Sequence, residues 1–134
     1  MSADPGNFAN VQTGELGLER MNSGLAVLII SGEHDLGTAP NLRRRLGDLV
    51  EEEDGLIIDL SPATFVDSSI LGVILDGKRR AEEAHVGYAV VHSSGANAVG
   101  RVLDVTGLRT ELPVHAERAE ASSAIAIGSG EGAR

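Results

Sequence analysis

Short apolar runs alternate along the chain with segments in which apolar residues recur at helical spacing. Continuous runs of this kind are typical of strands buried on both faces of a sheet, and they cover residues 25–30, 56–60 and 86–91. Two weaker segments, 13–18 and 110–114, are predicted as shorter strands. Gly14 and Gly17 weaken the first of these and favour a place at the edge of the sheet.

Helical spacing predicts four helices between and after these strands. The first is expected to begin after Thr38, a plausible cap, with Pro40 in its first turn. The other three cover residues 69–84, 96–105 and 117–127. Strands that alternate with helices over short loops indicate an α/β fold with a mainly parallel sheet. We expect four or five strands in a mixed sheet, with the helices mainly on one face.

The length of 134 residues fits a single domain with a substantial core. Residues 1–12 are small, polar and interrupted by Pro5 and Gly6, so we expect a flexible N-terminal arm. The domain itself is expected to span residues 13–127. Small residues dominate 128–134, which we expect to form a frayed tail.

Composition then narrows the classes of partner. Aromatic residues make up 2% of the chain and the formal net charge is −9, which disfavours nucleic acid and anionic membranes as partners. The absence of cysteine excludes disulfides and thiolate metal sites. The N-terminus lacks the pattern of a signal peptide, and the apolar runs are too short to span a bilayer. We therefore expect a cytoplasmic protein.

The most defined polar feature is the junction Asp67-Ser68-Ser69, which follows a predicted strand and begins a predicted helix. A serine at this position can cap the free amides of the first helical turn. The same amides and the helix dipole also favour a negative charge such as a phosphate. Local sequence leaves both interpretations open, a structural cap or a phosphorylation site.

Three stretches together resemble a known family. They are Asp67-Ser68-Ser69-Ile70-Leu71-Gly72, the loop Ser31-Gly32-Glu33-His34-Asp35, and Ala98-Val99-Gly100-Arg101-Val102-Leu103-Asp104-Val105-Thr106-Gly107-Leu108. In this order they resemble the STAS domain, and more narrowly the anti-sigma factor antagonists. The resemblance runs from about residue 25 to the last helix. It implies a single STAS-type domain.

The resemblance also implies a function. In that family the serine after the aspartate is phosphorylated by an anti-sigma factor with serine kinase activity, which places the acceptor at Ser68. The unmodified antagonist binds the anti-sigma factor and frees the sigma factor, and a PP2C-type phosphatase reverses the modification. The alternative is a STAS scaffold or sensor module that phosphorylation does not control. Self-association is compatible with either role.

By the same resemblance, the residues expected to contact the partner are Asp35, Asp67, Ser69, Ile70 and Gly72. Asp67 is expected to orient the Ser68 hydroxyl. The chain departs from the family pattern at Ile70, where glycine is common, and at His34, where leucine is usual. No catalytic residue, cofactor or metal is expected.

The sequence gives less support to other kinds of functional site. A hydrolase with Ser68 as nucleophile and His92 as base lacks the Gly-x-Ser-x-Gly elbow. Residues 95–102 contain two glycines but lack the lysine of a phosphate-binding loop. Adjacent ligands such as Glu33, His34 and Asp35 rarely converge on one metal ion. The arginines at 43–45 are expected to pair with the acidic residues at 51–54.

Overall fold

Six strands form one mixed sheet in the computed structural model, which describes residues 14–93 and 97–132. The strands are β1 (Glu15–Asn22), β2 (Leu25–His34), β3 (Gly55–Asp59), β4 (Ala63–Val66), β5 (Gly87–Val91) and β6 (Val114–His115). Their order is β1-β2-β3-β5-β6, and β4 pairs with the far end of β2. β1 is antiparallel to β2, and the other pairs are parallel. The expected mixed α/β sheet is confirmed.

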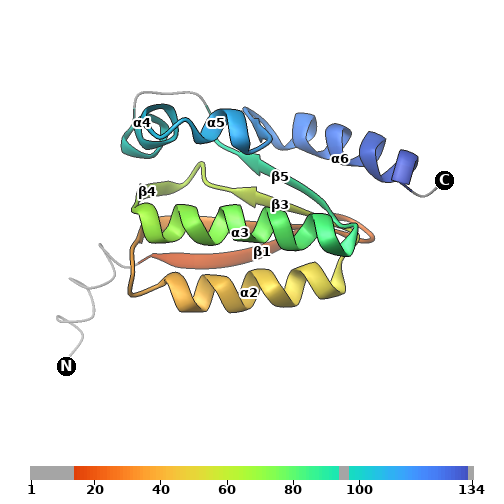
Figure 1. Ribbon diagram of the computed structural model, residues 1–134, viewed down its shortest axis with the longest axis horizontal. Helices are drawn as coiled ribbons and strands as arrows, with labels where there is room; N and C mark the ends of the chain where they lie inside the picture. The colour runs from red at the N-terminus through yellow and green to blue at the C-terminus, as the bar shows by residue number, and fades with distance from the viewer. Residues whose placement is uncertain (1–13, 94–96, 133–134) are drawn as a thin grey trace.

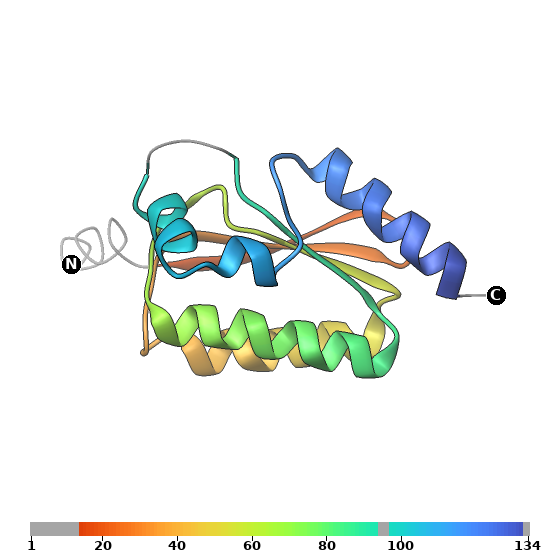
Figure 2. The same ribbon diagram turned by 45° about the horizontal axis from the view of Figure 1, so that its top comes forward.

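The helices lie mainly on one face of the sheet, as predicted. They are α2 (Ala39–Glu52), α3 (Ser68–Ala84), α4 (Ala98–Val105), α5 (Leu108–Glu111) and α6 (Arg118–Gly132). α2 and α3 run side by side, and their apolar faces share one core with the sheet and with α4 and α5 (Figure 1). α6 crosses the opposite face, where Ala121 and Ile125 cover a smaller cluster on β2, β3 and β5 (Figure 2).

Two strand predictions were wrong at their ends. β2 continues through the segment expected as a loop, because residues Gly32 to His34 pair with β4, a strand that the sequence pattern did not reveal. The predicted strand 110–114 is instead the short helix α5 followed by the two residues of β6. Both errors concern segments whose conformation depends on a neighbouring strand rather than on local periodicity.

The ends of the chain differ from expectation where they are described. α6 extends to Gly132, past the end expected at residue 127 and into the segment expected as a frayed tail. The expected arm, residue 13 and the start of the helix predicted at residue 96 lie outside the described residues.

Two predicted polar contacts are also corrected. Thr38 is the N-cap residue of α2, as predicted, but its side chain makes no capping hydrogen bond to that helix. The arginines of α2 do not pair with the acidic residues at its end. Arg43 approaches Asp76 of α3 at 3.9 Å, whereas the carboxylate of Glu53 is held by Arg20 of β1 at 2.7 Å. The Arg20 guanidinium lowers the pKa of Glu53, because it donates a hydrogen bond to the ionised form.

Candidate functional site

Asp67 is the residue that starts α3. Its backbone is extended, with φ −106° and ψ −176°, and its carboxylate accepts the N–H groups of Ser69 (3.0 Å) and Ile70 (3.2 Å). This is the geometry of a helix N-cap, in which an acidic side chain satisfies free amides of the first turn. The capping role considered for the two serines therefore belongs to Asp67, and Ser68 is the first residue of the helix.

The two serines differ in how their hydroxyls are used. The hydroxyl of Ser69, which is half-buried, donates to Oδ1 of Asp67 at 2.5 Å. Ser68 is exposed, and its hydroxyl makes no hydrogen bond within the described part of the chain. The expected orientation of the Ser68 hydroxyl by Asp67 is not observed, because the carboxylate binds Ser69 instead. Ser68 is thus the hydroxyl that an external reagent or enzyme can reach.

The loop after β2 converges on the same carboxylate. The backbone N–H of Leu36 donates to Oδ2 of Asp67 at 3.2 Å, across 31 residues of sequence. Within this loop, Oδ1 of Asp35 accepts the N–H of Gly37 at 2.9 Å and closes a tight turn. The structure therefore brings together the loops of Asp35 and Asp67, two residues that were expected to contact the partner.

The hydrogen bonds to Asp67 also set its charge state. The Ser69 hydroxyl makes the largest contribution to lowering the pKa of Asp67, and the amides of Ile70, Ser69 and Leu36 add to it. Partial burial opposes this shift without reversing it. All these donors favour the ionised carboxylate, so the site carries a fixed negative charge next to Ser68 at neutral pH.

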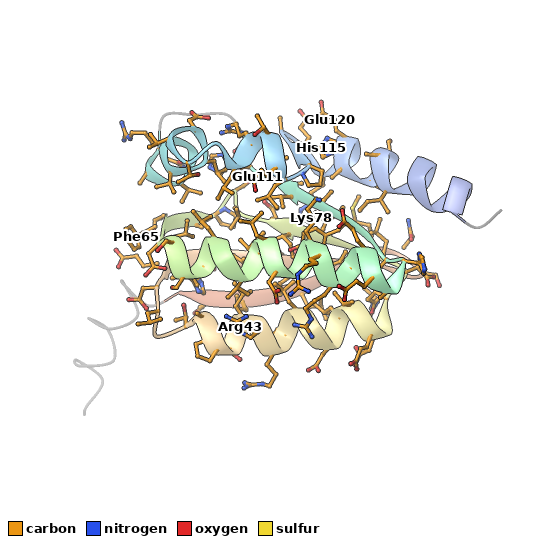
Figure 3. All side chains as sticks on the ribbon, viewed as in Figure 1. Arg43, Phe65, Lys78, Glu111, His115 and Glu120 are labelled. Atoms are coloured by element: carbon orange, nitrogen blue, oxygen red, sulfur yellow. The ribbon has the colours of Figure 1, made fainter. Side chains whose placement is uncertain are left out.

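Exposed apolar side chains occur in both segments that meet at Asp67. Leu36 is 73% exposed in the loop after β2, and Phe65 is 43% exposed in β4. Figure 3 shows Phe65 at the end of the molecule where α3 begins. Sequence reasoning missed both residues. In β4 two exposed residues, Thr64 and Phe65, lie between the buried Ala63 and Val66, so the segment lacks the alternation by which a sequence reveals a strand.

The other two residues expected to contact the partner, Ile70 and Gly72, differ in their exposure to solvent. Ile70 is fully buried in the main core, so its side chain cannot contact a partner, and that expectation was wrong. Gly72 is exposed, and a Cβ placed there would meet nothing within 4 Å. It follows Ser68 by one helical turn and therefore lies on the same side of α3.

The structure does not assemble the competing hydrolase site. His92 is 1% exposed, and burial lowers the pKa of its imidazole, with a further decrease from Arg109. Its surroundings also include Asp59 and Asp104, but no contact with Ser68 occurs in residues 14–93 and 97–132. In the same residues, no three His, Cys, Asp or Glu side chains are grouped so that they could hold a metal ion.

Helices long and apolar enough to cross a bilayer are absent from the part of the chain that the structure describes.

Comparison with solved structures places this architecture among related proteins. The chain resembles an anti-sigma factor antagonist from Mycobacterium paratuberculosis, with 28% identity, a TM-score of 0.74, and coverage of 84% of this chain and 94% of that one. The anti-sigma factor antagonist SpoIIAA in its unphosphorylated form gives 20% identity, a TM-score of 0.67, and coverage of 83% and 96%. The Bacillus cell fate determinant SpoIIAA in its phosphorylated form gives 20% identity, a TM-score of 0.63, and coverage of 83% of this chain and 99% of that one.

Identities of 20% establish a common fold. A sequence profile supplies the family: that of the STAS domain matches residues 20–121, which include β2 to β6 and the junction between β4 and α3. The predicted resemblance is confirmed, and the chain belongs to the STAS domain family.

Proposed function

We propose that this protein is an anti-sigma factor antagonist controlled by phosphorylation of Ser68. In the unmodified form it binds an anti-sigma factor with serine kinase activity, and the sigma factor is released. The observation that carries the proposal is the exposed hydroxyl of Ser68 at the start of α3, which no described residue bonds, next to a serine whose hydroxyl is already held. The similarity to an anti-sigma factor antagonist from Mycobacterium paratuberculosis supports the choice of partner.

The binding surface that we propose is a switch face, defined as Leu36, Phe65, Ser68 and Gly72. Two exposed apolar side chains supply area that a partner can bury, and Gly72 allows its close approach. Asp35 and Ser69 contribute to this face by fixing its backbone, since the side chain of Asp35 bonds the amide of Gly37 and that of Ser69 bonds Asp67. The acidic net charge of the protein favours a partner with a basic surface.

Phosphorylation at this position is compatible with the fold. A phosphate adds about −1.5 to −2 charges, and at the start of a helix an exposed negative charge is favourable by roughly 0.3–1 kcal/mol. The nearby carboxylate of Asp67 offsets part of this gain, because it occupies the same end of the dipole. The modified protein therefore remains folded.

In a packed interface the same phosphate is unfavourable. It must lose water against Leu36 and Phe65, and it stands next to the ionised Asp67. A loss of about 3 kcal/mol weakens binding by more than a hundredfold. Removal of the phosphate by a PP2C-type phosphatase then restores binding. One reversible charge controls association while the architecture is unchanged.

Calorimetric titration with the anti-sigma kinase from the same organism tests this proposal. We expect tight binding by the unmodified protein and by Ser68→Ala, and a loss of about a hundredfold or more for the phosphorylated protein and Ser68→Asp. Ser123→Asp, on the exposed side of α6, is the matched control and is expected to bind like the wild type.

Mass spectrometry after incubation with kinase and ATP identifies the modified residue. We expect one phosphate on the wild type and none on Ser68→Ala. Phosphate retained in that variant contradicts the assignment of the acceptor. Equal affinity of the modified and unmodified forms would instead support the alternative of a STAS scaffold or sensor module.

A further inference from the structure

His34, the last residue of β2, is a polar side chain with 1% exposure. Its ring lies between partners on three segments. Nε2 is 3.0 Å from the carbonyl oxygen of Ser31 and 3.3 Å from that of Glu15 in β1, and Nδ1 is 3.1 Å from the hydroxyl oxygen of Thr38. The ring therefore joins the sheet to the turn before α2.

The partners determine where the hydrogens lie. Carbonyl oxygens only accept, so Nε2 carries the ring hydrogen and, in the neutral imidazole, Nδ1 accepts from the Thr38 hydroxyl. The oxygen of that hydroxyl accepts the N–H of Asp35 at 3.1 Å. The carbonyl of Asp35 is also 3.1 Å away, but it already receives the N–H groups of Thr38 and Ala39. Hydrogen bonds thus run in one direction, from the Asp35 amide through Thr38 to His34.

This series of hydrogen bonds connects His34 to Asp67, the residue that caps α3 beside Ser68. The turn that Thr38 holds contains Leu36, whose N–H donates to Oδ2 of Asp67 at 3.2 Å. Oδ1 of Asp67 holds Ser69 and caps α3. The ring of His34 is itself confined, because a Cβ at Gly14 would come within 2.3 Å of Nε2. The buried ring is therefore linked, through the turn that holds Thr38 and Leu36, to the first turn of α3.

From this geometry we infer that His34 is a positioning residue for the phosphorylation of Ser68. It acts through Thr38, which holds the turn whose Leu36 amide fixes Asp67. His34 does not contact Ser68 in the described residues, so it is not a catalytic residue. The inference rests on the proposed function of Ser68, but the hydrogen-bond geometry can be tested without any partner.

Amide hydrogen exchange of the full chain, followed by NMR, tests the geometry. Thr38→Val removes the donor to the ring and the acceptor for the Asp35 amide, and we expect exchange at Leu36 and Ser69 to accelerate about tenfold or more. Thr38→Ser keeps the hydroxyl and is expected to restore slow exchange. Thr106→Val removes a hydroxyl at the end of α4 and is the control, with no change at Leu36 expected. His34→Leu is expected to behave like Thr38→Val.

Phosphorylation kinetics with the anti-sigma kinase test the role. For Thr38→Val we expect kcat to fall about tenfold, and for Thr38→Ser we expect the wild-type value. A wild type that the kinase does not modify on Ser68 overturns the proposed function. A modified wild type together with unchanged kcat or unchanged Leu36 exchange in Thr38→Val overturns only the positioning role of His34.

Discussion

Ser68 and Ser69 are adjacent and chemically identical, and the structure separates them by environment. Ser69 gives its hydroxyl hydrogen to Asp67 and is half-buried, whereas Ser68 faces solvent as the first residue of α3. An acceptor must present a free hydroxyl to a kinase, and Ser68 alone of the two does so. This difference supports Ser68 as the modified residue.

Single cysteines measure this difference directly, because the chain has none of its own. We expect the thiol of Ser68→Cys to react with 5,5′-dithiobis(2-nitrobenzoate) about tenfold faster than that of Ser69→Cys, since both share the helix N-terminus but the first is exposed and the second is half-buried. Absorbance at neutral pH gives both rates. Equal rates would show that the two positions are equally accessible, contrary to this account of the site.

Asp67 links stability to pH. The pKa of Asp67 lies below the usual value of an aspartate, because the Ser69 hydroxyl and nearby amides stabilise the ionised form. The native state therefore favours the ionised carboxylate, and the stabilisation is fully present above the pKa of the unfolded chain. As the pH falls through the lowered native value, the carboxylate is protonated and the contribution is lost. We expect Asp67→Asn to lower the free energy of unfolding by about 1–2 kcal/mol at pH 6 and by less near pH 3.

Urea unfolding at both pH values measures this effect. The control is Asp48→Asn on the exposed face of α2, which we expect to change the free energy of unfolding by less than about 0.5 kcal/mol. A penalty for Asp67→Asn that is the same at pH 6 and pH 3 would mean that the charge of the carboxylate does not stabilise the cap.

Among the elements, α3 contains two glycines with different structural roles. A Cβ at Gly77 would lie 2.8 Å from the hydroxyl of Tyr88 and 3.2 Å from Cδ1 of Leu46 on α2. The Tyr88 hydroxyl is itself held by the carbonyl of Ile74 at 2.7 Å. Gly77 therefore permits α3 to pack closely on α2 and β5. Gly72 has no such neighbour.

Alanine substitutions distinguish these two roles. We expect Gly77→Ala to destabilise the protein by about 1–3 kcal/mol through overpacking, and Gly72→Ala to stabilise it by about 0.5–1 kcal/mol through helix propensity. Chemical denaturation measures both. A neutral Gly77→Ala would show that the tyrosine moves aside at little cost, and would remove the packing reason for this glycine.

In the whole molecule, α6 is tied to the sheet by one arginine. Nε of Arg118 donates to the carboxylate of Asp59 at 2.9 Å, and Nη1 donates to Glu19 of β1 at 2.6 Å. The side chain of Asp59 is 8% exposed at the end of β3, whereas that of Glu19 is 58% exposed. The guanidinium therefore neutralises a carboxylate that the fold has removed from water.

The two bonds of Arg118 are expected to differ in strength. Arg118→Met keeps the aliphatic stem but leaves Asp59 without its cation, and we expect a loss of about 1–3 kcal/mol in the free energy of unfolding. Glu19→Gln breaks the exposed pair alone, and a change below about 1 kcal/mol is expected. Urea denaturation provides both values. Similar losses for the two variants would contradict the assignment of most of the energy to the buried carboxylate.

Much of the architecture follows from local patterns. The runs at 25–30, 56–60 and 86–91 all form central strands, and helical spacing located α2 and α3 to within a residue or so of their observed ends. The hydrophobic pattern predicts these elements correctly because the burial of a strand on both faces, or of a helix along one stripe, repeats within the segment itself.

The prediction of the site was less complete. The junction Asp67-Ser68-Ser69 was located from sequence, but the roles within it were not, and Ile70, which was expected to contact the partner, is buried in the core. β4 and its exposed Phe65 were missed because four residues carry too little periodicity to show. Which residue caps, which is free and which is buried depends on the direction in which the helix leaves the strand.

The amino-acid sequence by itself determined an acidic α/β domain with a polar junction at the start of a helix, because hydrophobic period and capping chemistry are local properties. Only the tertiary structure decided that the Leu36 amide reaches Asp67 across 31 residues, and that Asp67 binds the hydroxyl of Ser69 while that of Ser68 is exposed. Such contacts join segments far apart in sequence. These contacts depend on how β2 pairs with β4, and that pairing cannot be read from the sequence of either strand alone.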